Sequence, residues 1–190
     1  MTKLNEKTIE IEYRSIFDED TYSRLKVFLD AKAKNLGEDD KDVFFFIFPD
    51  KLLKVVDNMS KKTAKIVLKL NKIGRGNDFE EIEIPIQQED VKKAIRVFTV
   101  LGFIELQNSF QKRQNYLYKG VELALKYSDT WGFHLELEIM VGDKKEVTEA
   151  KEKISDVANE LQISLMTETE LVEFTRKIDE GYKIGKYAKK

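Results

Sequence analysis

Short segments in which apolar and charged residues alternate recur along the whole chain, and they constrain its fold most strongly. Ile9–Arg14 and Phe133–Val141 both alternate with period two, which is typical of β-strands with one apolar and one polar face. Further strand-like segments bring the number of predicted strands to eight. These further segments are Val43–Phe48, Leu52–Val56, Lys65–Asn71, Phe79–Ile86, Phe103–Tyr118 and Val121–Leu125.

Helical segments interrupt and follow these strands. Apolar residues recur at helical spacing in four stretches, which are Asp18–Gly37, about Glu89–Leu101, Val147–Leu161 and the stretch after Thr167. Asp18 is the predicted N-cap of the first helix and Gly37 its end, and Thr167 with Glu170 forms a capping box before the fourth. Antiparallel strands with helices packed outside them predict an α+β fold, and residues 1–190 are expected to form a single domain.

The charge composition limits the class of partner. Lys and Arg number 33 and Asp and Glu number 35, so the signs nearly cancel although charged residues make up 36% of the chain. A nucleic-acid-binding protein normally carries a basic excess. The balance therefore predicts clusters of mixed sign and no nucleic-acid partner.

Cysteine is absent from the chain, which excludes disulfides and thiolate metal sites. Any bound metal should therefore be a hard cation held by oxygen ligands. The first residues, from Met1 to Thr8, lack the apolar core of a signal peptide, and no apolar run approaches membrane-spanning length. We expect a cytoplasmic protein without a membrane partner.

The charged residues of the alternating strands gather on one face, because residues two apart in a strand point to the same side. The groups that share a face in this way are Glu10, Glu12 and Arg14 on the first strand and His134, Glu136 and Glu138 on the last. Lys69 and Arg113 extend the charged face to strands in the middle of the chain.

Two interpretations of these charged faces remain open from the pattern alone. In the first, they form the solvated face of an open antiparallel sheet, where cross-strand ion pairs each contribute little stability. In the second, the sheet closes and the charged faces line a tunnel. Crowded carboxylates would then require a cation, and unpaired basic residues would require an anion with several negative charges.

The order of several motifs resembles a known family. The segment Glu10–Arg14 resembles the N-terminal E-x-E-x-K signature of the CYTH superfamily, the triphosphate tunnel metalloenzymes, with Arg in place of Lys. Three later segments resemble further motifs of that family, which are Ile66–Lys69 (L-T-L-K), Gln111–Tyr116 (K-x-R-x-x-Y) and Trp131–Glu138 (L-G-x-F-x-E-I-E). The resemblance covers nearly the whole chain and points to the branch of class IV adenylate cyclases and thiamine triphosphatases. It implies an eight-stranded antiparallel β-barrel that forms a tunnel, with helices packed outside.

The resemblance also implies roles for individual residues. The implied ligands of Mg²⁺ or Mn²⁺ are Glu10, Glu12, Glu83, Glu136 and Glu138. The implied phosphate-binding residues are Arg14, Lys54, Lys69 and Arg113. Glu10, Glu12 and Arg14 are in addition the implied catalytic residues.

These implied roles suggest a metal-dependent phosphoryl-transfer enzyme that binds a small triphosphate. The substrate would be inorganic triphosphate or an organic one such as ATP or thiamine triphosphate, and the activity that of a triphosphatase or a class IV adenylate cyclase. The alternative is a catalytically silent protein that binds nucleotides or polyphosphate. The oligomeric state stays open between a monomer and a homodimer.

The chain departs from the family pattern at four positions. Val56 and Gln111 stand where the pattern has basic residues, and Glu81 stands where some members have Arg. Lys126 replaces an Asp just before the final loop. The loss of basic residues favours an altered enzyme or the silent binder, whereas Lys126 would restore a positive charge near the site.

Two single residues receive a structural interpretation. His134, the only histidine, is interpreted as a hydrogen-bonded structural residue although it shares a face with Glu136 and Glu138. Trp131, the only tryptophan, is interpreted as a core residue, with stacking on a base at the tunnel mouth as the alternative.

Overall fold

The computed structural model describes residues 9–48, 50–70, 81–103 and 105–187. The strands in these residues are β1 (Ile9–Phe17), β2 (Lys34–Glu38), β3 (Lys41–Ile47), β4 (Leu52–Asn58), β5 (Thr63–Lys69), β6 (Glu81–Ile86), β7 (Glu105–Tyr118), β8 (Val121–Ser128) and β9 (Gly132–Val141). The α-helices are α1 (Glu19–Lys32), α2 (Val91–Val100), α3 (Val147–Glu160) and α4 (Glu168–Lys183). Single 3₁₀ turns, Gln88–Asp90 and Lys144–Glu146, precede α2 and α3.

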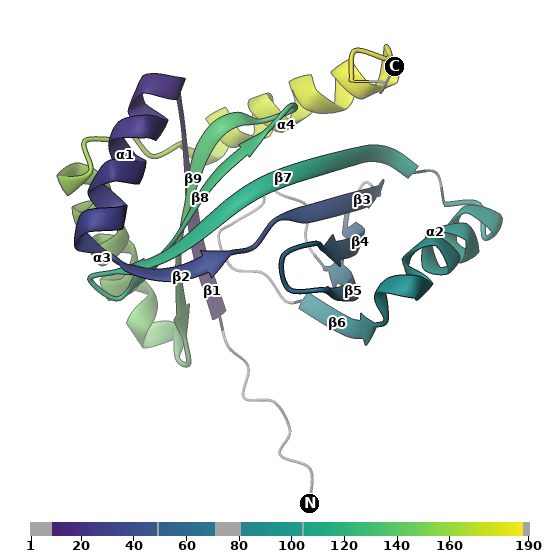
Figure 1. The fold of residues 1–190 in the computed structure, drawn as a ribbon, viewed down its shortest axis with the longest axis horizontal. Coiled ribbons are helices and arrows are strands. Elements are labelled where there is room, and N and C mark those ends of the chain that lie inside the picture. The colour runs from purple at the N-terminus through teal and green to yellow at the C-terminus, as the bar shows by residue number, and fades with distance from the viewer. Residues whose placement is uncertain (1–8, 49, 71–80, 104, 188–190) are drawn as a thin grey trace, which may run out of the picture.

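All of these strands belong to one antiparallel sheet with the order β1-β9-β8-β7-β3-β4-β5-β6, and β2 pairs with β7 outside that path. The long strand β7 joins the two halves of the sheet, as Figure 1 shows, because its ends pair with β3 and with β8. The eight predicted strands and the α+β class are therefore confirmed. The outer ends of two predicted strands, at residue 71 and at residues 79–80, lie outside the described residues.

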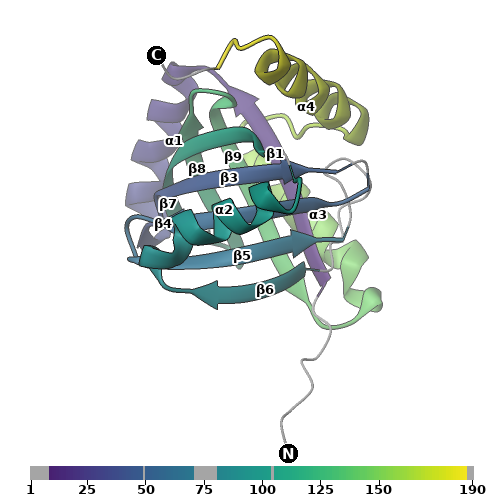
Figure 2. The same ribbon diagram turned by 90° about the vertical axis from the view of Figure 1, so that its right-hand side faces the viewer.

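The path of eight strands ends at β1 and β6, and the described residues contain no backbone pairing between these two strands. Hydrogen bonds therefore do not close the predicted barrel in the part of the chain that the structure describes. The sheet is nevertheless strongly curved. Figures 1 and 2 show the β3–β6 half facing the half that contains β1, β8 and β9.

The first helix is shorter than its sequence pattern suggests. Its N-cap is confirmed, because the Asp18 side chain accepts a hydrogen bond from the backbone N–H of Thr21. The helix ends at Lys32 rather than at Gly37, and the following residues form the strand β2, which sequence analysis missed. After Ala33 the chain offers few apolar side chains for a buried helix face, whereas an extended backbone can pair with β7. Gly37 has a φ of 97° at the point where this pairing shifts register.

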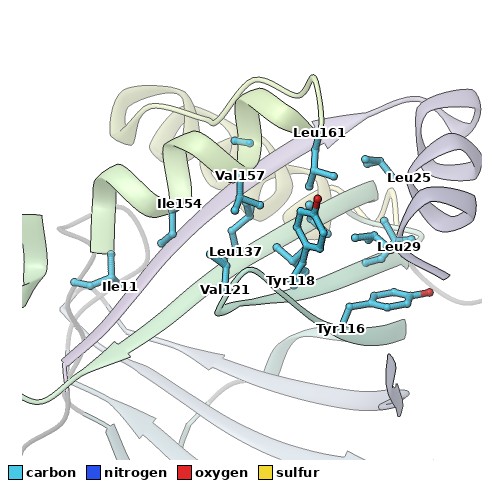
Figure 3. Packing of buried hydrophobic residues seen from close by; sticks show 14 of the residues in the cluster. Ile11, Leu25, Leu29, Tyr116, Tyr118, Val121, Leu137, Ile154, Val157 and Leu161 are labelled. Carbon is cyan, nitrogen blue, oxygen red and sulfur yellow. The ribbon is translucent and has the colours of Figure 1, made fainter. Parts of the chain in front are cut away.

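The apolar cores lie between the sheet and the helices. α1 and α3 cover the outer face of the half that contains β1, β8 and β9, where Ile11, Leu137, Leu29 and Ile154 are fully buried together (Figure 3). α2 crosses the outer face of β4 and β5 (Figure 2). Because side chains alternate along each strand, the charged residues of the same strands must point to the opposite, inner face.

The helix α4 lies at one end of the curved sheet, against β7. The Tyr182 hydroxyl donates a hydrogen bond to the backbone oxygen of Asn108 at 2.9 Å, and the Gln107 amide donates to Asp179. The predicted capping box starts this helix, since Thr167 Oγ1 accepts from the Glu170 N–H and the Glu170 carboxylate accepts from the Thr167 N–H.

Replacing Thr167 by Ala should lower the free energy of unfolding by about 1 kcal/mol, because the capping oxygen of α4 is lost. The measurement is chemical denaturation followed by circular dichroism. Thr169→Ala is the matched control, because Thr169 is exposed within the same helix. Equal effects of the two substitutions would contradict a capping role for Thr167.

Candidate active site

A cavity of about 420 Å³ lies on the inner face of the sheet. Seven cationic side chains line it, which are Arg14, Lys41, Lys54, Lys65, Lys69, Arg113 and Lys126. Six carboxylates line it as well, which are Glu10, Glu12, Glu83, Glu136, Glu138 and Asp179. The structure thus brings every site residue implied by the family resemblance to one cavity. The charged faces thus line a cavity, although backbone hydrogen bonds do not close the sheet around it in the described residues.

The pairing of β1 with β9 sets the geometry of the carboxylates. Arg14 lies opposite Glu136 in the register, and Glu12 lies opposite Glu138. The Arg14 guanidinium forms an ion pair with Glu12 on its own strand, and its Nε donates to Glu136 Oε1 at 3.2 Å. Arg14 is only 7% exposed, so this ion pairing occurs largely out of water.

Glu136 is the centre of a cluster of cations. Besides Arg14, Lys126 Nζ donates to its Oε2 at 3.0 Å, and Arg113 Nη1 lies 3.5 Å from the same oxygen. Burial alone would raise the pKa of Glu136, but Lys126, Arg14 and Arg113 hold it well below its ordinary value. Burial in turn lowers the pKa of Lys126 to about 8 against the opposing effect of Glu136. Glu136 is therefore ionised throughout the physiological range.

Glu138 has the opposite environment. Burial, followed by the negative charges of Glu10 and Glu12, raises the pKa of Glu138 to about 7. Like charges therefore accumulate where the first and last strands meet.

The raised pKa of Glu138 predicts a pH dependence of stability in the metal-free protein. Between the ordinary pKa of 4.5 and about 7, the folded chain holds a proton at Glu138 that the unfolded chain releases. The free energy of unfolding should therefore fall as pH rises through this window, and Glu138→Gln should remove that part of the slope. Denaturant titrations at several pH values measure it. An identical slope in the variant would show that Glu138 does not titrate in this window.

Side chains bridge the gap between the two halves of the sheet. Lys69 Nζ on β5 lies 3.8 Å from Glu10 Oε2 on β1, although these strands are not paired. Lys54 and Glu83 also line the cavity from β4 and β6, and Glu83 forms an ion pair with Lys65. The phosphate-binding candidates on β4 and β5 thus face the carboxylates of β1 and β9 across the same cavity.

Residues 8–170 match the model of the CYTH domain family. The chain belongs to this family. The match covers most of the chain, including the predicted motif on β1 and the carboxylate pair on β9. The comparison with curated proteins gives no match.

Solved structures share the fold of this CYTH domain. The PH1012 protein of Pyrococcus horikoshii OT3 is 28% identical with a TM-score of 0.67, over 82% of this chain and 91% of that one. A candidate adenylate cyclase from Vibrio parahaemolyticus is 17% identical with a TM-score of 0.65, over 82% and 90% of the two chains. HpAC1 from Hippeastrum, an adenylyl cyclase candidate with a dominant triphosphatase activity, is 18% identical with a TM-score of 0.59, over 84% and 90%. None of the helices in the described residues is both long and apolar enough to cross a membrane.

The carboxylates of this CYTH domain have the chemistry that a hard divalent cation requires. Glu10, Glu12 and Glu138 supply oxygen donors, and next to burial the negative charges of Glu10 and Glu12 raise the pKa of Glu138. Within the described residues, however, no three His, Asp or Glu side chains are already arranged to hold an ion. Glu10 and Glu12 contact Lys69 and Arg14 instead. The three carboxylates therefore fit a divalent metal once Glu10 and Glu12 give up their ion pairs with Lys69 and Arg14 and bind the ion instead.

The structural interpretation is confirmed for His134 but not for Trp131. His134 is buried, its Nδ1 lies 3.0 Å from the Gly132 oxygen, and burial, together with Lys126, lowers its pKa to about 3. This neutral, hydrogen-bonded ring agrees with the structural interpretation. Trp131, in contrast, is only partly buried and lines the cavity, with the Arg14 guanidinium 5.6 Å from its ring centre. The interpretation of Trp131 as a core residue is wrong, because Trp131 lies in the turn between β8 and β9 and lines the cavity.

Sequence analysis missed several residues of the cavity. Lys65 and Lys41 have the same strand parity as Lys69 and Val43, respectively, so period-two counting would have placed them on the inner face. Lys41 Nζ contacts Asp39 at 2.7 Å. Asp179 reaches the cavity from α4, and no pattern in the chain indicates how that helix docks.

Proposed function

We propose that this CYTH domain is a divalent-metal-dependent triphosphatase that binds its substrate in the charged cavity. The observation that carries the proposal is the convergence of seven cationic and six carboxylate side chains on one cavity of about 420 Å³. This mixture matches a polyphosphate that arrives with a metal ion, since one part of the ligand needs cations and the other needs carboxylates.

Ligand binding would exchange the partners within the cavity. Lys69 now contacts Glu10, and Arg14 contacts Glu12. Phosphate oxygens would take over Lys69, Arg14 and also Arg113, because charge-assisted hydrogen bonds to phosphate are strong and directional. The carboxylates released in this way would become free to bind the metal. In this proposal the internal ion pairs keep the charges neutralised until the substrate arrives.

Glu10, Glu12 and Glu138 are the residues that would hold Mg²⁺ or Mn²⁺. The ion would neutralise charge on the phosphate oxygens and on the leaving group. Glu83, which was also implied as a ligand, stays a further candidate on β6. Glu136 was implied as a ligand as well, but three cations contact it in this structure, Lys126, Arg14 and Arg113. We therefore assign to Glu136 the role of holding Arg14, Arg113 and Lys126 in position for the phosphate. Lys54 would add a further contact from β4.

Closure of the eight-stranded path into a tunnel is part of the same proposal. The contact between Lys69 and Glu10 supports it, because it joins β5 to β1 through side chains. A closed cavity would exclude water from the phosphate contacts and so strengthen them.

The product of a single incubation tests the proposal. The protein is mixed with tripolyphosphate, ATP or thiamine triphosphate and with Mg²⁺ or Mn²⁺, and orthophosphate, pyrophosphate and cyclic AMP are resolved by chromatography. We expect metal-dependent release of orthophosphate. Cyclic AMP with pyrophosphate would identify a class IV adenylate cyclase instead. Saturable binding of tripolyphosphate without any product would identify the silent binder.

A further inference from the structure

Glu136 and Glu138 lie two residues apart on β9 and face the same cavity, but their neighbours differ in charge. Glu136 is contacted by Lys126 at 3.0 Å, by Arg14 at 3.2 Å and by Arg113 at 3.5 Å. Glu138 forms no ion pair within the described part of the chain and lies opposite Glu12 in the register. One carboxylate is thus surrounded by cations and the other by carboxylates.

Lys126 is the most enclosed of the three cations around Glu136. Its side chain is 6% exposed, against 8% for Arg14 and 20% for Arg113. It extends from β8, which is hydrogen-bonded to β7 on one side and to β9 on the other. Among the described residues, Glu136 is the only carboxylate within ion-pair distance of its ammonium. Because a buried ammonium without a counter-ion is unstable, Lys126 stays bound to Glu136.

A divalent ion at Glu136 would meet three positive charges that already contact the same carboxylate. Two of them, Arg14 and Lys126, are buried, so their side chains cannot move into solvent to make room for the ion. Repulsion between charges is strongest where water is excluded, so a metal at this position would be strongly disfavoured. The carboxylates of Glu10, Glu12 and Glu138 form a more favourable environment for the metal, because a cation there relieves the repulsion between their negative charges.

We propose that Lys126 is an internal cation that neutralises Glu136 and limits this CYTH domain to one divalent ion, bound on the side of Glu10, Glu12 and Glu138. The inference rests on the proposed function, because it presupposes that the cavity takes a divalent ion. It also explains why Lys at position 126, in place of the Asp of the family pattern, would change the metal site. An Asp at position 126, as the pattern has it, would add oxygen donors beside Glu136, whereas Lys supplies only N–H donors.

On the side of Glu136, phosphate oxygens would be bound by N–H groups of Lys126, Arg14 and Arg113 rather than by a metal. An ammonium has a fixed place and a single charge, whereas a metal ion exchanges with solution. The positive charge on this side of the cavity therefore should not depend on the metal concentration.

Counting bound Mn²⁺ tests the inference without an activity assay. Mn²⁺ is titrated into the wild-type chain, Lys126→Asp and Lys126→Met, and free Mn²⁺ is measured by electron paramagnetic resonance. We expect one bound ion per chain in the wild type and a second one in Lys126→Asp, where a carboxylate joins Glu136. Lys126→Met should stay at one ion, because it adds no donor and Arg14 and Arg113 still neutralise Glu136.

Three outcomes would overturn the inference, and they separate it from the proposed function. Two ions in the wild type would contradict the role of Lys126 but leave a metal-dependent triphosphatase intact. One ion in both the wild type and Lys126→Asp would show that residue 126 does not set the number. No ion in the wild type would contradict both the inference and the metal site of the proposed function.

A second measurement applies if Lys126→Asp does not fold. Lys126→Met and Glu136→Gln are compared with the double variant by denaturant unfolding in the absence of metal. If the two side chains neutralise each other, the double variant should lose clearly less stability than the sum of the single variants. Additive losses would overturn the internal ion pair.

Discussion

Replacing Glu10 and Glu12 together by Gln is expected to reduce metal-dependent hydrolysis by at least about a hundredfold while the fold survives, because the ion provides several kcal/mol of charge stabilisation. Gln keeps the size of both side chains but removes two of the three carboxylates proposed to hold the metal. Arg14 keeps its contact with Glu136 at 3.2 Å in the double variant. The loss of two negative charges also relieves Glu138, whose pKa should fall from about 7.

Turnover with Mg²⁺ and thermal unfolding without metal are the two measurements. The matched control is Glu149→Gln with Glu152→Gln, since these glutamates are exposed on α3 and do not line the cavity. Full turnover in the cavity variant would remove β1 from the mechanism. A large loss of stability with unchanged turnover per folded molecule would show that both carboxylates serve Arg14 and Lys69 structurally.

Replacing Glu136 by Gln should lower the free energy of unfolding by about 3 kcal/mol, because removal of one partner leaves buried cations uncompensated. The side chain of Glu136 is 14% exposed and contacts Lys126, Arg14 and Arg113. The sign of the pH effect follows from its lowered pKa. The stabilisation is fully present above the ordinary pKa of 4.5 and is lost as pH falls through the folded value.

Denaturant unfolding at neutral and acidic pH measures this contribution. Glu152→Gln is the control, because Glu152 is an exposed glutamate on α3 outside the cavity and should change stability little. The difference between the two variants should shrink at low pH, where Glu136 is protonated in the unfolded chain. A difference that is small at neutral pH would contradict the central place of Glu136 in the cation cluster.

The alternation along the strands was enough to predict the sheet and the side of it that carries the site. Ile11 and Leu137 pack against α3, and Glu12 and Glu136, their neighbours in the chain, line the cavity. This agreement has a simple cause. In an extended chain, the direction of a side chain follows from its parity, whatever the rest of the fold does.

The partners of each side chain could not be predicted in the same way. Glu136 and Glu138 are equivalent in the sequence pattern, yet the pKa of one is lowered and that of the other is raised. The difference arises because β7 and β8 bring Arg113 and Lys126 to Glu136, whereas β1 brings Glu12 to Glu138. Which strands are neighbours, and in which register, is decided by the whole sheet and not by any one segment.

The strand β2 and the helix α4 show a second limit of prediction from the sequence. Lys34–Glu38 has little apolar character, and it is extended because β7 offers it a pairing partner. The fourth helix was predicted from its capping box, but its contact with the end of β7 through Tyr182 and Gln107 has no local signal. Tertiary contacts, rather than local propensity, determine both features.

Calorimetric titration of tripolyphosphate with Mg²⁺ measures whether the cavity binds a metal–triphosphate. The wild-type chain is compared with Lys69→Gln/Arg113→Gln, and with Lys144→Gln/Lys145→Gln as an exposed control outside the cavity. We predict saturable binding of one ligand per wild-type chain, a Kd that is unchanged in the control, and a Kd weakened at least about tenfold in the cavity variant, because charge-assisted hydrogen bonds are lost. Absence of binding to the wild type, or equal binding to all three chains, would contradict a triphosphate site in this cavity.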